Sequence, residues 1–308
     1  VHAGQLIAER YADGVDQQTA LKGWSMNKTL TGLVIGMLVD RGWLDPDAPA
    51  PVEEWSSADD PRAQITLRHL LTMTSGLGFD ESYGDLQSDV VQMLFTERSA
   101  AARAADAPLA HEPGAHWSYS SGTTNILARI ARNTLDQHGR SWAEFMQSEL
   151  FAPIGVTTAV MEADSAGDFV GSSFGYMSAQ DWARIGMLLN NQGRAPDGAQ
   201  IVAADWISFM ATDNGRSEGQ YGAQLWLNRS DPAGDDPPME GVPADAMFLS
   251  GHDGQLVAAI PSAGVVVVRL GETSTWSREA GVGDVLRAAL NAADMVGQEG
   301  LEPPTRPL

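Results

Sequence analysis

A serine and a lysine three residues apart stand at the start of an apolar stretch, in the segment Ser25-Met26-Asn27-Lys28. Residues at positions i and i+3 share one face of a helix, so the lysine amine can reach the serine hydroxyl. The amine can take that proton only if burial or a nearby cation lowers its pKa. The chain contains only two lysines, and this spacing predicts that Ser25 is a nucleophile activated by Lys28.

Two later segments carry side chains that suit the same chemistry. The first is Trp117-Ser118-Tyr119-Ser120-Ser121-Gly122, and the second is Gly251-His252-Asp253-Gly254-Gln255. The first offers a phenol and hydroxyls that can move protons, and the second offers an imidazole.

In this order the three segments resemble the active-site motifs of the penicillin-recognising serine hydrolases, which include serine β-lactamases and penicillin-binding proteins. Tyr119-Ser120-Ser121 stands at the place of the family's Tyr-x-Asn, and His252-Asp253-Gly254 at the place of its Lys/His-Thr/Ser-Gly strand. Residues 65–77, 112–114, 150–155 and 221–226 are also similar to family segments. Tyr-Ser-Ser-Gly and Gly-His-Asp-Gly-Gln indicate the branch of 6-aminohexanoate-dimer hydrolase and the β-lactamase-like (family VIII) esterases.

The resemblance implies a role for each site residue. Ser25 forms an acyl-enzyme, Lys28 takes its proton, and Tyr119 is the acid–base for acylation and deacylation, with a phenol pKa well below its ordinary value of about 10. The backbone N–H groups of Ser25 and Gln255 form the oxyanion hole. The remaining expected contacts to substrate come from His252, Gly254, Ser121 and the loop residue Tyr83.

Other interpretations of single residues stay open. Tyr119 could belong to aromatic core packing beside Trp117. His252 could be a strand histidine with no catalytic part, and Tyr83 an ordinary exposed loop tyrosine.

Two replacements shape the expected activity. True class C β-lactamases carry Tyr-Ala-Asn and Lys-Thr-Gly, where this chain has Ser121 and His252 in place of the asparagine and the lysine. These changes remove a carboxamide and a positive charge that hold a β-lactam. The sequence therefore predicts a serine hydrolase acting on small esters or amides. The alternatives are a D-amino-acid peptidase, a weak β-lactamase, or a sensor domain that is acylated and stays so.

The pattern of apolar residues predicts an α/β (α+β) fold. Apolar spacing favours helices over 30–38, 65–73, 141–151, 178–190, 203–210 and 280–293, and after residue 122, with strands at 5–11, 221–227, 255–260 and 265–270. Strands at both ends indicate one antiparallel sheet built from N- and C-terminal segments. With the resemblance, we expect a single β-lactamase-like α/β/α domain over residues 1–308, with sheet regions 1–22 and 215–295 and a helical region 23–214.

Composition limits the partners. The formal charge is -21, with 40 acidic and 19 basic side chains, which argues against nucleic acid and anionic membrane surfaces. The absence of cysteine excludes disulfides, and the scattered histidines do not suggest a metal site, so we expect no cofactor. We also expect no membrane-spanning segment. No signal peptide is visible, which leaves a periplasmic, secreted or cytoplasmic location open. The oligomeric state is also left open. The expected partner is a small ester or amide.

Overall fold

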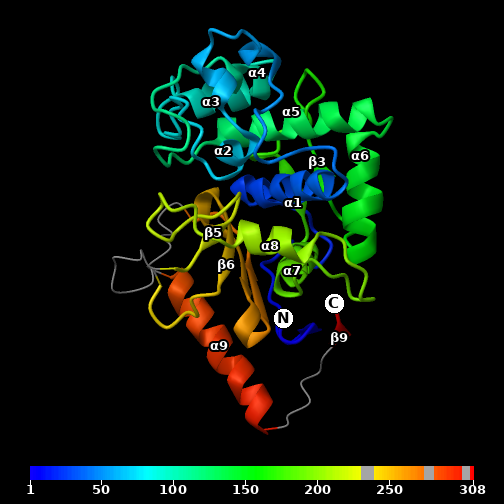
Figure 1. The fold of residues 1–308 in the computed structure, drawn as a ribbon. Helices are drawn as coiled ribbons and strands as arrows, with labels where there is room; N and C mark the ends of the chain where they lie inside the picture. Colours follow the sequence, from blue (N-terminus) through cyan, green and yellow to red (C-terminus); the bar gives the residue numbers. More distant parts are fainter. Residues whose placement is uncertain (230–238, 274–280, 300–305) are drawn as a thin grey trace.

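A four-stranded antiparallel sheet lies at the centre of the computed structural model, which describes residues 1–229, 239–273, 281–299 and 306–308 (Figure 1). Its order is β5–β6–β7–β8. The N-terminal residue joins the outer strand, because Val1 and Val266 exchange backbone hydrogen bonds of 2.7 and 2.9 Å. The expected sheet from both ends of the chain is therefore present. The strands are β1 Gln5–Leu6, β2 Leu21–Lys22, β3 Val160–Met161, β4 Gly175–Met177, β5 Trp226–Leu227, β6 Met247–Gly251, β7 Gln255–Ile260, β8 Val265–Arg269 and β9 Arg306–Pro307.

Both faces of strand β7 are buried, which explains its unbroken apolar sequence. Leu256 and Ile260 belong to a cluster with Leu286 of helix α9, whereas Val257 and Ala259 face the larger core that contains helices α1 and α7. Alternate side chains of a strand point to opposite faces, so helices cover the sheet on both sides. The predicted α/β/α sandwich is confirmed.

The helices cover the sheet and build the upper half of the molecule in Figure 1. Their bounds are α1 Asn27–Asp40, α2 Leu67–Leu71, α3 Asp89–Phe95, α4 Ala100–Ala105, α5 Ser121–Gln137, α6 Trp142–Phe145, α7 Ala179–Asn190, α8 Ala204–Met210 and α9 Val282–Glu299. A π-helical stretch, Met146–Phe151, continues α6.

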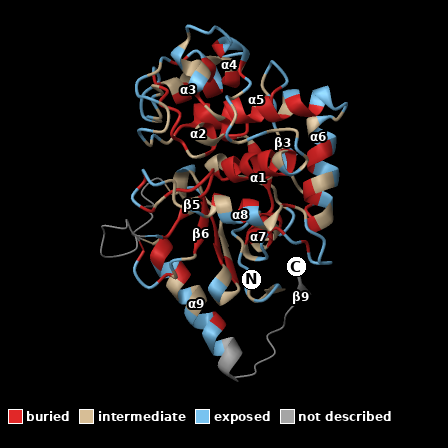
Figure 2. Ribbon diagram, in the orientation of Figure 1, coloured by how far each residue is buried: buried red, intermediate tan, exposed pale blue. Residues whose placement is uncertain are grey.

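Helix α1 is buried from Asn27 to Leu38, as its red colour in Figure 2 shows. A helix that is apolar around its whole circumference belongs inside a protein. Gly36 allows close packing, because a Cβ atom there would lie 2.2 Å from the Trp206 indole of α8. The helix that follows the expected nucleophile is thus held rigidly by its surroundings.

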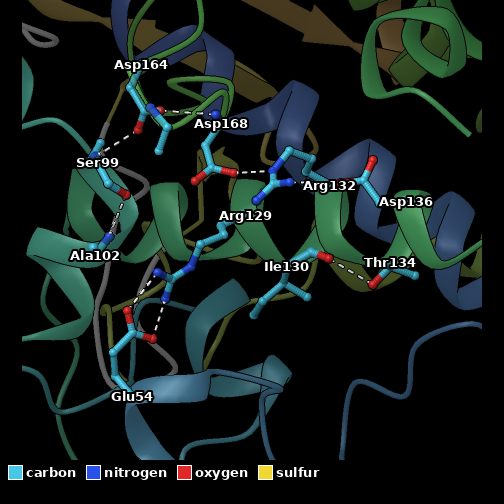
Figure 3. Close-up of polar contacts among 12 residues, drawn as sticks. Glu54, Ser99, Ala102, Arg129, Ile130, Arg132, Thr134, Asp136, Asp164 and Asp168 are labelled. Atoms are coloured by element: carbon cyan, nitrogen blue, oxygen red, sulfur yellow. Dashed lines mark hydrogen bonds and ion pairs between the residues drawn. The ribbon is translucent and has the colours of Figure 1, made fainter.

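Ion pairs anchor helix α5, which begins at Ser121 (Figure 3). Arg129 binds both carboxylate oxygens of Glu54 at 2.7 and 2.8 Å. Arg132 binds Asp168, which lies outside the helix, at 2.5 Å, and it also pairs with Asp136 of the same helix at 2.8 Å. Two paired contacts of this kind restrain both the position and the rotation of the helix.

Several expected elements differ in extent. The predicted strand 5–11 contains only β1, and only β5 forms within 221–227, because Tyr221 bridges back to Trp226 in a tight turn. Helix α9 starts at Val282, two residues after its predicted start. The helix expected over 141–151 changes to π-helical geometry at Met146.

Other elements were not predicted. Helices α3 and α4 and strand β6 were missed. The three-stranded sheet β2–β4–β3 lies partly within the region expected to be helical. The segment 231–246 is rich in proline, glycine and aspartate, and its residues 231–238 lie outside the described residues, as do residues 300–305 of the proline-rich C-terminal segment.

Candidate active site

Ser25 lies in a 3₁₀ turn, Trp24–Met26, directly before helix α1. Trp24 has a φ of 50°, a left-handed conformation that is uncommon for a bulky residue. Gly23 is required at the start of the turn, because a Cβ atom there would lie 2.3 Å from the Trp182 ring. The Lys22 ammonium sits 3.7 Å from the centroid of the Trp24 ring, a cation–π contact that restrains it. The packing of Gly23 against Trp182 and the contact of Lys22 with Trp24 therefore restrain the backbone that leads to Ser25.

The third motif forms a tight turn between β6 and β7 and not a strand, which corrects the expectation for His252-Asp253-Gly254. Asp253 and Gly254 have φ values of 57° and 87°. Gly251 lets the turn approach the nucleophile, because a Cβ atom there would lie 2.2 Å from the Gly23 carbonyl oxygen. This close backbone contact brings Gln255, the first residue of β7, to the Ser25 turn.

Lys28 is buried against the nucleophile, with a side chain only 2% exposed. Its Nζ atom lies 3.0 Å from Ser25 Oγ, 2.8 Å from Ser121 Oγ and 3.3 Å from the Ser172 carbonyl oxygen. Burial lowers the pKa of Lys28 to about 8, although the Glu81 carboxylate acts in the opposite direction. An amine with this pKa is partly neutral near physiological pH and can accept a proton.

Glu81 is a site residue that the sequence interpretation missed. Its carboxylate accepts hydrogen bonds from the Ser121 N–H at 2.7 Å and from the Ser121 hydroxyl. Ser121, expected at the substrate surface, is instead fully buried between Lys28 and Glu81. No motif spacing marks Glu81, and the available signal was its position two residues before Tyr83 in the same loop.

Tyr119 lies beside Lys28, whose Nζ atom is 4.8 Å from the centroid of the tyrosine ring. The ring is partly exposed, but its hydroxyl is surrounded by protein. Burial raises the pKa of Tyr119 above its ordinary value, and Glu81 raises it further, while hydrogen bonding with Ser25 and Trp226 only partly offsets both effects. The expected lowering of this pKa was therefore wrong, since desolvation of the phenolate and the Glu81 carboxylate both raise it.

Tyr83 closes over the nucleophile from the loop at 78–88. Its ring stacks on His252 with a centroid distance of 4.6 Å and meets Trp24 edge-on at 6.1 Å. The hydroxyl is buried, has no hydrogen-bond partner of ordinary geometry, and lies near Ser121 and Ser173. Burial raises the pKa of Tyr83, so the phenol is neutral and its proton is available to a bound group. His252 thereby joins the aromatic wall of the site and remains partly exposed.

A cavity of about 390 Å³ opens beside Trp24 and is lined by Lys22, Asp253, Gln255 and Glu272, among others. The Gln255 side chain is tied to Gly271 by hydrogen bonds of 3.0 and 2.9 Å, so this wall is rigid. A larger cavity of about 570 Å³ lies beside Trp142 and Phe169 and contains none of the expected catalytic side chains. The smaller cavity is lined by Trp24, the neighbour of Ser25, and by Gln255, although Ser25, Lys28 and Tyr119 do not line it.

The described residues contain no group of three or more histidine, aspartate or glutamate side chains that could hold a metal ion. No helix within the described ranges is long and apolar enough to cross a membrane.

Comparisons with known proteins identify relatives of this chain. A family model named Beta-lactamase matches residues 1–292. The 6-aminohexanoate-dimer hydrolase of Paenarthrobacter ureafaciens is 27% identical over 255 residues, which cover 73% of this chain and 62% of that protein. Esterase EstB of Burkholderia gladioli is 31% identical over 167 residues, which cover 49% of this chain and 41% of that protein.

A solved structure shows the same fold at greater coverage. It is a Bacillus anthracis protein provisionally named as a 6-aminohexanoate-dimer hydrolase, with a TM-score of 0.76 and 23% identity, covering 98% of this chain and 79% of that one. The alignments with the two curated relatives span 62% and 41% of their own lengths, which is less than two thirds.

Proposed function

The chain belongs to the Beta-lactamase family, and on this basis we propose that it is a serine hydrolase that cleaves small esters or amides through an acyl-enzyme on Ser25. The observation that carries the proposal is the contact of Ser25 with Lys28, a buried lysine whose pKa falls to about 8. A nucleophile within hydrogen-bond distance of an activated base is the signature of covalent catalysis.

Acylation begins when neutral Lys28 accepts the Ser25 proton. The oxygen then attacks the substrate carbonyl carbon, and the developing oxyanion binds the backbone N–H groups of Ser25 and Gln255. The C–O or C–N bond of the substrate breaks as the leaving group is protonated. The result is an ester between Ser25 and the acyl group.

Tyr119 protonates the leaving group and regains its proton from the Lys28 ammonium. A phenol with a raised pKa is neutral at working pH, so Tyr119 relays a proton and Lys28 is the resting-state base. In deacylation the path runs in reverse, and a water molecule replaces the leaving group.

The hydrogen bonds and charge around Ser121 disfavour a β-lactam as substrate. Ser121 offers no carboxamide and its hydroxyl is taken by Glu81, which also places a negative charge beside the nucleophile. A substrate carboxylate at this position would be repelled. Two of the curated relatives are named as a 6-aminohexanoate-dimer hydrolase and an esterase, and these names support substrates of the simpler kind.

A short-chain p-nitrophenyl ester assay tests the proposal. The wild type should hydrolyse the ester, Ser25→Ala should not, and mass spectrometry should find the acyl group on Ser25. Ser148→Ala is the matched control, because Ser148 is exposed and remote from the motif segments. Equal hydrolysis by wild type and Ser25→Ala would refute the assignment of Ser25 as the nucleophile.

A sensor domain is the alternative from a different class. It would give one equivalent of nitrophenol and then stop, because the acyl group would stay on Ser25. Continued turnover after the burst separates the hydrolase from the sensor. Turnover of a chromogenic cephalosporin at the rate of the ester would instead favour a β-lactamase.

A further inference from the structure

Glu81 ends a chain of hydrogen bonds that begins at the nucleophile. Lys28 Nζ lies 3.0 Å from Ser25 Oγ and 2.8 Å from Ser121 Oγ, and the Ser121 hydroxyl donates to Glu81. The Ser121 N–H donates to the second carboxylate oxygen at 2.7 Å. Two contacts thus hold the carboxylate against one buried residue.

The proton positions along this chain follow from which groups can donate. An ionised carboxylate only accepts hydrogen bonds, so the single Ser121 hydroxyl proton is committed to Glu81. Ser121 can then offer Lys28 only a lone pair. The Ser172 carbonyl oxygen, 3.3 Å from Lys28 Nζ, also only accepts.

A neutral amine has two protons and one lone pair. The two protons of Lys28 go to Ser121 and Ser172, and the lone pair is left facing the Ser25 hydroxyl. If Glu81 were uncharged, the Ser121 proton could turn toward Lys28 and occupy that lone pair.

We propose that Glu81 is a positioning residue that acts through Ser121 to aim the lone pair of neutral Lys28 at the Ser25 hydroxyl. The inference rests on the proposed function, because it takes Ser25 as nucleophile and Lys28 as base. It places Glu81 in the role of the third group that orients a catalytic base. Because Glu81 belongs to the loop at 78–88, the base is oriented only while this loop lies over the site.

Three titratable groups lie around the pair of Lys28 and Ser121 in the described structure. Tyr119 and Tyr83 are neutral phenols, since burial raises the pKa of each. The Glu81 carboxylate raises the pKa of Lys28. Glu81 therefore has two separable effects, one on the geometry of the base and one on its pKa.

The pH dependence of kcat/KM for a p-nitrophenyl ester separates these effects. In Glu81→Gln we expect the plateau above the Lys28 pKa to fall about tenfold to a hundredfold, because a misaimed base loses part of its catalysis. We also expect the acid limb, the part of the profile in which kcat/KM rises with pH, to move to lower pH. The reason is that the Glu81 carboxylate, which raises the Lys28 pKa, is gone. The size of the nitrophenol burst normalises each rate to competent enzyme.

Glu97→Gln is the matched control, since Glu97 is exposed and the substitution changes the net charge equally. It should reproduce the wild-type profile. A Glu81→Gln profile identical to wild type would overturn the inference. In Glu81→Gln, a lower plateau with an unmoved acid limb would do the same, because the Glu81 carboxylate would then exert no field on Lys28.

A double-mutant cycle tests whether Glu81 acts through Ser121. Once Ser121→Ala has removed the hydroxyl, Glu81→Gln should lower the plateau little further, whereas independent effects would multiply and contradict the chain. Glu81→Asp keeps the charge but shortens the reach, so its acid limb should stay nearer wild type while its plateau falls. If wild type and Ser25→Ala are equally active, the proposed function fails; if only the Glu81 variants match wild type, this inference alone fails.

Discussion

The rate of hydrolysis should follow the deprotonation of Lys28 as pH is raised. Burial lowers the pKa of Lys28 from 10.5 to about 8. Only the neutral amine can take the Ser25 proton, so kcat/KM should rise with pH, by about tenfold per unit well below pH 8, and level off above it.

The structure gives this effect a magnitude. With a pKa of about 8, about 9% of Lys28 is neutral at pH 7, whereas about 0.03% of an exposed lysine is neutral there. Burial thus enriches the active form by about 300-fold at pH 7. The sign follows from desolvation, which disfavours the charged ammonium in the buried site.

The assay measures initial rates of p-nitrophenyl ester hydrolysis across neutral and alkaline pH, read at the isosbestic wavelength of nitrophenol and nitrophenolate. Ser25→Ala supplies the background hydrolysis at each pH. Lys28→Met should abolish the enzymatic rate across the range.

Tyr119→Phe identifies the titrating group. It should lower the rate but leave the midpoint of the acid limb unchanged, because the pKa of Tyr119 is raised out of the range tested. A midpoint near pH 10 in the wild type would refute the argument from burial. Loss of the acid limb in Tyr119→Phe would show that a tyrosinate, and not Lys28, is the base.

Three further predictions concern the loop and the core. Tyr83→Phe should lower p-nitroanilide hydrolysis by about tenfold and ester hydrolysis far less, because the unpartnered hydroxyl can donate to a poor leaving group; equal effects on the two substrates would remove this role. Gly36→Ala should lower the free energy of unfolding by about 1–3 kcal/mol in urea titrations, since its Cβ would meet the Trp206 indole at 2.2 Å. Gly84→Ala is the control and should leave the free energy of unfolding unchanged, because a Cβ atom there has nothing within 4 Å. Similar losses in the two variants would contradict the packing argument. Asp181→Ala should cost about 3 kcal/mol, because the buried carboxylate accepts from the Thr157 and Thr158 N–H groups at 2.8 and 2.7 Å, and a loss below about 1 kcal/mol would argue against it.

Local patterns predicted much of the fold. The apolar runs of α1, α5 and α7 and the hairpin of β7 and β8 were expected, because the spacing of apolar residues that predicts them depends only on neighbouring residues. Helices α3 and α4 are short, and β6 has partners only through tertiary pairing, so their sequences carried weaker signals. The sheet β2–β4–β3 joins segments about 150 residues apart, a pairing that no local pattern contains.

The sequence by itself predicted that Ser25 and Lys28 lie together at the start of a helix, and that Tyr119 and the segment at His252 belong with them. Only the tertiary structure decided how these groups behave. Burial from several distant segments lowers the pKa of Lys28 and raises that of Tyr119, in opposition to the expectation from charge alone. Glu81 reaches Ser121 across 40 residues of sequence. Desolvation and long-range hydrogen bonds depend on which segments meet in space, and a linear pattern does not record that.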